Sequence, residues 1–178
     1  MMPLRPATLD DLDAIRALIV ASMRGLSDGF YTSAQVESGL RHVYGPDTQL
    51  IADGTYFVIE AEGVIVAAAG WSRRATLYGG DQTKTGPDPL LDPSRDPARI
   101  RAFYVAPTHA RRGLGRQLLE HCATAAGAEG FTTLELMATL PGVPLYAACG
   151  FVALERIEPV QPDGVAIPFV RMRRAVGS

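Results

Sequence analysis

Three residue types that often build functional sites are scarce in this sequence. Its 178 residues include two cysteines, three histidines and one lysine. Two cysteines are too few for a disulfide framework, and both have apolar neighbours, so Cys122 and Cys149 are expected to be buried free thiols. His42, His109 and His121 show no metal-ligand spacing, and we therefore expect no metal site.

Long apolar runs and a large excess of either charge are also absent. No run reaches the roughly 18 apolar residues of a membrane span, and no apolar signal segment follows the first residues, so a cytoplasmic protein is expected. Lys and Arg number 17 against 19 Asp and Glu. Nucleic-acid and membrane-surface binding usually need a positive field, and neither is expected here. The composition, 47% hydrophobic and 20% charged, fits one soluble globular domain over residues 1–178.

Strand and helix patterns alternate along the chain, which predicts an α/β fold with a mixed sheet. Strands are predicted at 4–7, 56–61, 64–71, 99–105, 131–138, 151–158 and 165–173, and helices at about 8–25, 33–43, 113–126 and 144–149. The run from Val64 to Ala69 is almost continuously apolar, as in a central strand buried on both faces. The last two strands are predicted to form a hairpin, and the final strand is expected to lie at a sheet edge or to bulge at Pro168, because proline cannot donate to a ladder.

Residues 75–98, called the insertion below, interrupt this alternation with prolines, glycines and aspartates. A stretch of this length without periodicity is either a functional loop or a disordered one. Its glycine steps can act as hinges, and Leu77, Tyr78, Leu90 and Leu91 give it apolar surface, so we predict a mobile lid over the substrate side. Trp71 precedes it and is either part of the core or part of a substrate pocket.

Residues 105–116 carry the clearest chemical signal. They read as a strand end, a turn and a helix start that contains Gly113 and Gly115. Glycines at a helix start admit a ligand to the free backbone N–H groups, which bind phosphate together with the helix dipole. An ordinary strand-to-helix turn would have the same glycines. A Rossmann fingerprint is excluded because Leu118 replaces its third glycine, and no Walker sequence is present.

Three segments in order resemble the GNAT acetyltransferase superfamily. Val105-x-Pro107 followed by Arg111-Arg112-Gly113-Leu114-Gly115-Arg116 is similar to motif A of that family. The opening residues 4–11 are similar to its first strand and the helix that follows. Residues 145–151, Leu-Tyr-Ala-Ala-Cys-Gly-Phe, are similar to its downstream Tyr-x-x-x-Gly-Phe motif. The resemblance extends from residue 4 to about residue 173.

The resemblance implies a splayed sheet of six to seven strands flanked by helices, with acetyl-CoA as co-substrate and no metal. The acceptor would be an amine of a small molecule or peptide, attacked directly without a covalent enzyme intermediate, and a homodimer is left open. The pantetheine arm of the donor would lie between the fourth and fifth strands. The family's donor contacts map onto Phe103, Tyr104, Val105, Arg111, Arg112, Gly113, Leu114, Gly115 and Arg116.

Tyr146 matches the position of the family's general acid. A phenol near pKa 10 can protonate the CoA thiolate as it leaves; alternatively, Tyr146 only packs in a short helix. An acceptor amine must lose a proton, and the fourth strand contains no acid. Glu135 on the fifth strand is the remaining candidate base. The equal alternative is that Glu135 is only a solvent-facing strand residue.

Two departures from the family pattern bear on function. Ala110 occupies the usual Gln or Arg position of motif A, and Thr139 falls where an Asn often precedes the tyrosine. The first removes a side-chain contact to the donor, while the second concerns the acceptor side. A non-catalytic module that senses acyl-CoA is the alternative function, and the presence of Tyr146 speaks mildly against it.

Overall fold

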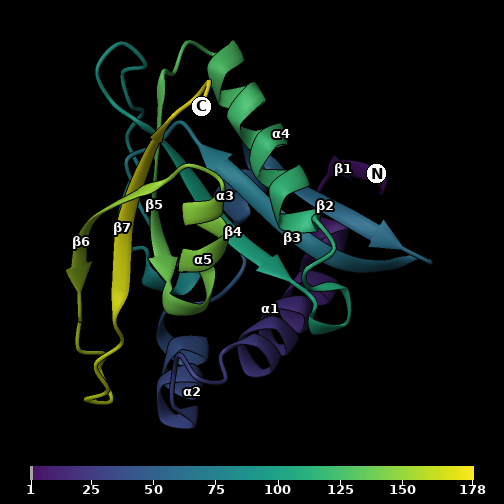
Figure 1. Ribbon diagram of the computed structural model, residues 1–178, viewed down its shortest axis with the longest axis vertical. Helices are drawn as coiled ribbons and strands as arrows, with labels where there is room; N and C mark the ends of the chain where they lie inside the picture. Colours follow the sequence, from purple (N-terminus) through teal and green to yellow (C-terminus); the bar gives the residue numbers. More distant parts are fainter. Residues whose placement is uncertain (1) are drawn as a thin grey trace.

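The computed structural model describes residues 2–178, which form one open seven-stranded sheet flanked by helices (Figure 1). The order across the sheet is β1-β2-β3-β4-β5-β7-β6. All neighbours are antiparallel except β4 and β5, which are parallel. The strands are β1 (Leu4–Pro6), β2 (Tyr56–Ala61), β3 (Val64–Ser72), β4 (Ala98–Val105), β5 (Thr133–Thr139), β6 (Val152–Ile157) and β7 (Phe169–Ala175). The predicted mixed α/β sheet is confirmed.

The sheet separates two hydrophobic cores. The helices are α1 (Leu12–Leu26), α2 (Ser33–His42), α3 (Thr48–Ala52), α4 (Leu114–Ala128) and α5 (Val143–Ala148). Side chains of α4 and α5 pack into one core, and those of α1, α2 and α3 pack into the other. In β2, Phe57 and Ile59 face the first core while Tyr56 and Val58 face the second. This alternation buries both faces of the central strands, as their apolar sequences predict.

A β-bulge and an early end of strand pairing shape the middle of the sheet. Ala68 pairs with Tyr104 and Gly70 with Arg101, so Ala102 and Phe103 together oppose a single residue of β3. Ala102 has a φ of +50°, and its carbonyl accepts a hydrogen bond of 2.9 Å from Tyr56. A bulge bends its strand and redirects its side chains.

Pairing between β4 and β5 is confined to the first residues of β4. Only Ala98–Leu134 and Arg99–Glu135 are in register, and after Arg99 the two strands no longer pair. The bulge lies just beyond this point in β4. The sheet is therefore open between β4 and β5 where Phe103 to Val105 lie.

The structure corrects two sequence-based expectations. The last strand begins at Phe169 instead of residue 165 and lies inside the sheet, while β6 forms the edge. Pro168 lacks an N–H and cannot donate to a ladder, and the strand begins at the residue after it. Helix α3 was not expected; Asp47 caps it by accepting from the Gln49 amide at 3.0 Å.

The first part of the insertion is hydrogen-bonded to β4, where Arg101 donates to Thr76 and Gly79. The base of the insertion is a short antiparallel pairing in which the Ala75 amide donates to Pro89 and the Leu91 amide to Arg73. The insertion contains one turn of 3-10 helix at Asp81–Thr83, and its last residue, Ala98, already belongs to β4.

Other predictions concern single residues. Cys122 and Cys149 are buried free thiols, as expected. Trp71 belongs to the core: it is 2% exposed and packs against Phe131. Within residues 2–178, no helix is both long and apolar enough to cross a membrane.

Candidate active site

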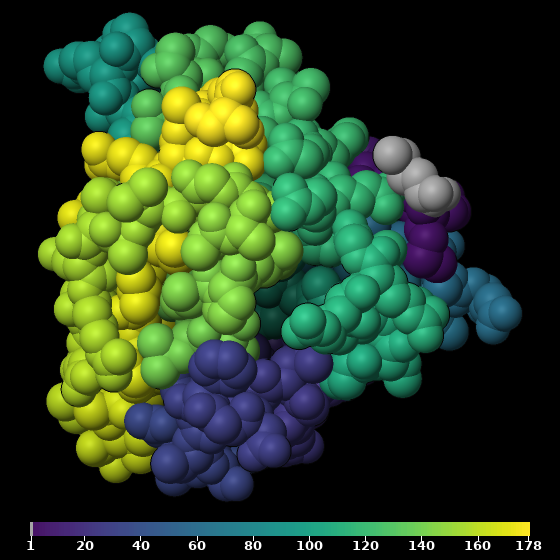
Figure 2. Space-filling model, viewed as in Figure 1, coloured from purple at the N-terminus to yellow at the C-terminus, as the bar shows by residue number. Residues whose placement is uncertain are grey.

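Two cavities of the described chain meet where the sheet is open. The larger cavity has a volume of about 660 Å³. Its walls come from α1 and the residues after it, from β4, from the loop before α4 with the first turn of α4, and from residues 139–146. Figure 2 shows this hollow between the α1 end, the loop before α4 and the α5 segment, with β4 at its floor.

The loop before α4 forms one end of the larger cavity. Arg111 and Gly113 have φ values of +61° and +83°, and Gly113 is the N-cap residue of α4. Within the described chain, no backbone amide of residues 111–116 donates to a protein acceptor. Free N–H groups at a helix start, together with the helix dipole, can bind an anion. Arg111 and Arg116 line the same cavity, whereas Arg112 does not.

Gly113 and Gly115 of the motif have different structural roles. A Cβ on Gly113 would meet no other atom within 4 Å, so this residue supplies its positive φ and leaves the space in front of the helix open. A Cβ on Gly115 would lie 2.7 Å from Leu145 and 3.4 Å from Phe103. Gly115 therefore allows α4 to approach α5 and β4 closely.

The bulged end of β4 forms the floor of the larger cavity. Phe103, Tyr104 and Val105, the residues to which the family's pantetheine contacts map, all line it. With β5 splayed away, the edge of β4 lacks its neighbouring strand here, and backbone groups of β4 can bond a ligand that runs along it.

Tyr146 stands where the larger cavity meets a smaller one. Its ring contacts Phe103 and Phe151 edge to face, at centroid distances of 5.6 and 5.8 Å. Position 142 must be glycine for this ring to fit, because a Cβ there would lie 2.9 Å from the ring. In the described structure the hydroxyl of Tyr146 has no hydrogen-bond partner. Burial raises its pKa, which keeps the phenol protonated.

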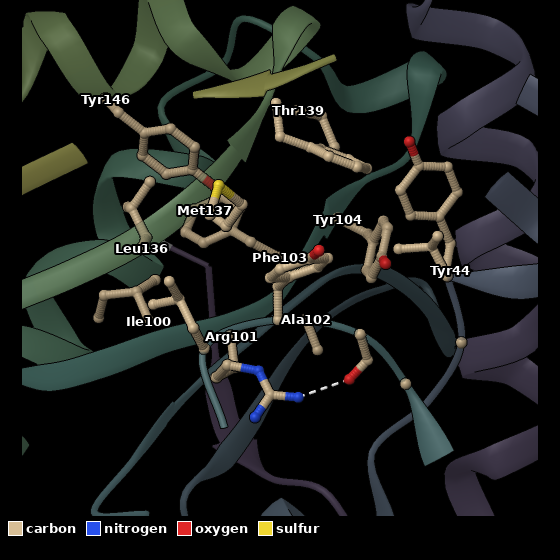
Figure 3. Close-up of a pocket in the computed structure, with 17 residues that line it drawn as sticks. Tyr44, Ile100, Arg101, Ala102, Phe103, Tyr104, Leu136, Met137, Thr139 and Tyr146 are labelled. Carbon is tan, nitrogen blue, oxygen red and sulfur yellow. Dashed lines mark hydrogen bonds between the residues drawn. The ribbon is translucent and has the colours of Figure 1, made fainter. Parts of the chain in front are cut away.

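The smaller cavity, about 70 Å³, lies beside Tyr146 and is shown in Figure 3. Its walls come from β4, β5, β7, the residues after α2, and Leu77–Gly80 of the insertion. Among the lining residues, both cavities share Phe103, Tyr104, Thr139 and Tyr146. A donor in the larger cavity and an acceptor in the smaller one would therefore meet at Tyr146.

Glu135 lies outside the lining of both cavities. It is 5% exposed, and its register partners are Arg99 on β4 and Arg173 on β7. Its carboxylate accepts a bond of 3.0 Å from Nε of Arg173 and lies 3.4 and 3.7 Å from Arg171 and Arg99. This geometry favours an ion-pair role in the sheet, and the catalytic role of Glu135 stays a prediction.

Several wall residues were not found from the sequence. Ser22, Met23 and Leu26 of α1 and Phe30 after it line the larger cavity, while Tyr44, Met137 and Phe169 line the smaller one. None of these residues belongs to a recognisable motif, so the sequence gives no signal that separates them from ordinary core or surface residues. No group of three or more His, Cys, Asp or Glu side chains within residues 2–178 could hold a metal ion.

Comparisons with known proteins identify the family of this chain. A statistical description of the Acetyltransferase (GNAT) family matches residues 21–151. The match covers more than half of the chain, and the chain therefore belongs to this family. No curated protein sequence gives a significant match.

Solved structures show the same fold at low sequence identity. A GCN5-related N-acetyltransferase from Rhodopseudomonas palustris is 22% identical, with a TM-score of 0.69 over 98% of this chain and 96% of its own. PaiA N-acetyltransferase from Thermoplasma acidophilum, solved with coenzyme A, is 12% identical, with a TM-score of 0.65 over 98% and 99%. YncA from Salmonella typhimurium, solved with acetyl-CoA, is 19% identical, with a TM-score of 0.61 over 99% and 94%.

The family and the site together define the class of protein. GNAT acetyltransferases use acetyl-CoA and act on amine acceptors, and this chain is an acetyltransferase of that class.

Proposed function

We propose that the chain acts as one domain that acetylates an amine of a small molecule or peptide at the junction of the two cavities. The observation that carries this proposal is the position of Tyr146. This buried residue lines both cavities, and its phenol is protonated. The donor would lie in the larger cavity, with its pyrophosphate at the start of α4. Backbone groups of Phe103, Tyr104 and Val105 would bind the pantetheine arm. Arg111 and Arg116 would add positive charge beside the pyrophosphate.

The chemistry follows from these positions. The neutral amine nitrogen attacks the thioester carbonyl carbon, a new C–N bond forms, and a backbone N–H at the bulge of β4 stabilises the oxyanion. The C–S bond then breaks, and the Tyr146 phenol gives its proton to the departing thiolate. The proton lost by the nitrogen returns to the phenolate through water. Neither cysteine takes part, since direct attack needs no covalent enzyme intermediate.

The test is release of free CoA thiol with a panel of primary amines, followed by mass analysis of the acetylated product. Thiol release that depends on both substrates supports the proposal. Tight acetyl-CoA binding by calorimetry with no transfer to any amine would instead indicate a sensor of acyl-CoA.

A further inference from the structure

A third cavity of the described chain, called the outer cavity below, adjoins the smaller one. Its volume is about 590 Å³, and its walls come from the end of α2, from residues 76–87 of the insertion and from residues 159–162 between β6 and β7. Val43 and Tyr78 line both the outer and the smaller cavity. The smaller cavity, about 70 Å³, has room for only a few non-hydrogen atoms. An acceptor larger than this therefore extends past Tyr78 into the outer cavity.

The charged side chains that line the outer cavity are all basic. They are Arg41 and His42 at the end of α2 and Lys84 of the insertion, and no carboxylate of the described chain lines this cavity. The other polar side chains of the wall are hydroxyls and amides, which belong to Thr76, Gln82, Thr83, Thr85 and Gln161. A polar wall whose charged groups are basic favours an anionic group over a cationic one.

The carboxylates around the outer cavity are bonded to protein donors. Asp163 accepts a bond of 2.8 Å from Arg41. Asp47 is 1% exposed and accepts from Lys84 at 2.6 Å and from Arg101 at 2.8 Å. Three further acids are next in sequence to lining residues, and each is bonded within the chain: Asp81, Asp88 and Glu158. These carboxylates hold the basic side chains in place, while the cavity itself presents the basic groups.

Arg41 and Lys84 keep N–H groups for a ligand. In the described structure only Nη2 of Arg41 bonds a protein acceptor, which leaves Nε and Nη1 unused. Lys84 uses one of its three N–H groups on Asp47. The side chains of Arg41 and Lys84 are 60% and 20% exposed, so solvent and a ligand can reach both. A carboxylate has two oxygens and can accept from both residues at once.

The walls that carry these donors are held by backbone hydrogen bonds. The Gly80 amide of the insertion donates to Val43 at 2.9 Å, which joins the insertion to the chain after α2. On the opposite wall, the Gln161 amide donates to Val165 at 2.9 Å and closes the connection between β6 and β7. Donors on fixed walls need little ordering when a ligand binds.

We propose that the outer cavity binds a carboxylate which the acceptor carries at a distance from its amine. This proposal rests on the proposed function and adds a recognition site to it. The amine reaches Tyr146 through the smaller cavity, the connecting atoms pass Tyr78, and Arg41 and Lys84 donate to the carboxylate. Lys84 makes the insertion part of the specificity site. An acceptor with a second ammonium at this end is disfavoured because it meets the same two cations.

The test uses ω-amino acids of increasing length: 4-aminobutanoate, 6-aminohexanoate and 8-aminooctanoate. Each is compared with its carboxamide, which keeps the shape and removes the charge, and with the diamine of the same length. For at least one length we expect kcat/KM to be about 10-fold higher for the acid than for the amide, mainly through KM, with the diamine poorest. Added salt should reduce this ratio, because it screens the attraction.

Two variants test the named donors. Arg41→Gln and Lys84→Gln should each bring the ratio of acid to amide towards one. Lys84→Gln also removes a partner from the buried Asp47, whereas Arg41→Gln changes an exposed side chain and leaves the core as it is. Arg16→Gln is the matched control: this arginine is 57% exposed, pairs with Asp13 and lines none of the three cavities, so the ratio should stay at its wild-type value.

Other outcomes separate this proposal from the proposed function. A wild-type ratio near one at every length, or a ratio that Arg41→Gln and Arg16→Gln change alike, overturns the carboxylate site while acetyl transfer stands. Calorimetry on the CoA-bound protein measures the site without turnover. Binding of an ω-amino acid that Arg41→Gln weakens, with no acetyl transfer, supports the site and overturns the proposed function. Transfer to the amides without measurable binding of any ω-amino acid overturns the site alone.

Discussion

The rings of Phe103 and Tyr146 meet edge to face, with 5.6 Å between their centroids and 80° between their planes. Phe103 belongs to the bulge of β4 and Tyr146 to α5, so this contact crosses the opening of the sheet. It fixes the phenol at the place where the two cavities join.

Tyr146→Phe keeps this contact and removes only the hydroxyl. Turnover should fall roughly 100-fold, the range for loss of a general acid, while the affinity for acetyl-CoA stays close to wild type. Steady-state kinetics and calorimetry measure the two quantities. Tyr31→Phe is the matched control: it lies outside both cavity linings, so it should lose stability and keep turnover. Wild-type turnover in Tyr146→Phe would make Tyr146 a packing residue.

Gly113→Val tests the anion site at the start of α4. A side chain with a φ of +83° costs about 1–2 kcal/mol of stability, and here it would also occupy the space in front of the free N–H groups. CoA affinity should therefore fall at least 10-fold. Gly63→Val carries the same backbone penalty, with a φ of +77° and open space, far from the cavities. Calorimetry showing equal CoA affinity in the two variants would place the pyrophosphate elsewhere.

Shortening the insertion tests the acceptor wall. Joining Thr76 to Asp88 through a short glycine-containing turn removes Leu77–Gly80 from the smaller cavity and Lys84 from Asp47. Acceptor KM should rise, and CoA affinity should not change because the larger cavity contains no insertion residue. Hydrogen exchange of the insertion in the wild-type protein should slow when acceptor binds, as expected of a lid. Unfolding of the shortened chain, or exchange that ignores the acceptor, would make the insertion a structural strap.

Glu135→Gln separates an ion-pair role from a catalytic one. Because the carboxylate is buried among Arg99, Arg171 and Arg173, we expect the free energy of unfolding to fall by about 3 kcal/mol and turnover to change little. Glu129→Gln, which breaks a partly exposed pair with Arg73, should cost less than about 1 kcal/mol. A large loss of turnover without loss of stability would restore Glu135 as the base.

Asp11 should make stability depend on pH in the acid range. The Arg5 guanidinium donates two bonds of 2.9 Å to this carboxylate and lowers its pKa from 3.8 to about 2. A lowered carboxylate pKa stabilises the folded state fully above the unfolded value, and this stabilisation is lost as pH falls through the folded value. Urea unfolding of wild type and Asp11→Asn should therefore differ above about pH 4 and converge toward pH 2. A difference that is constant over this range would show that the ion pair does not contribute.

The sequence predicts the donor side of the site better than the acceptor side. Gly113 and its helix were identifiable because a helix start, glycines and arginines are contiguous in the chain. The smaller cavity is assembled partly from Tyr44, Met137 and Phe169, which are far apart in sequence and belong to no motif. The bulge at Ala102 and the arginines around Glu135 depend on strand register, which local periodicity does not specify.

The residues shared by the two cavities also have a thermodynamic consequence. Because Phe103, Tyr104, Thr139 and Tyr146 line both, a molecule in one cavity alters the wall offered to the other. Linkage then requires that acetyl-CoA changes the acceptor Kd by the same factor by which the acceptor changes the acetyl-CoA Kd. Substitutions at these shared positions should change that common factor, whereas substitutions at Gly113 or Tyr44 should change one Kd and leave the coupling between the substrates as it was.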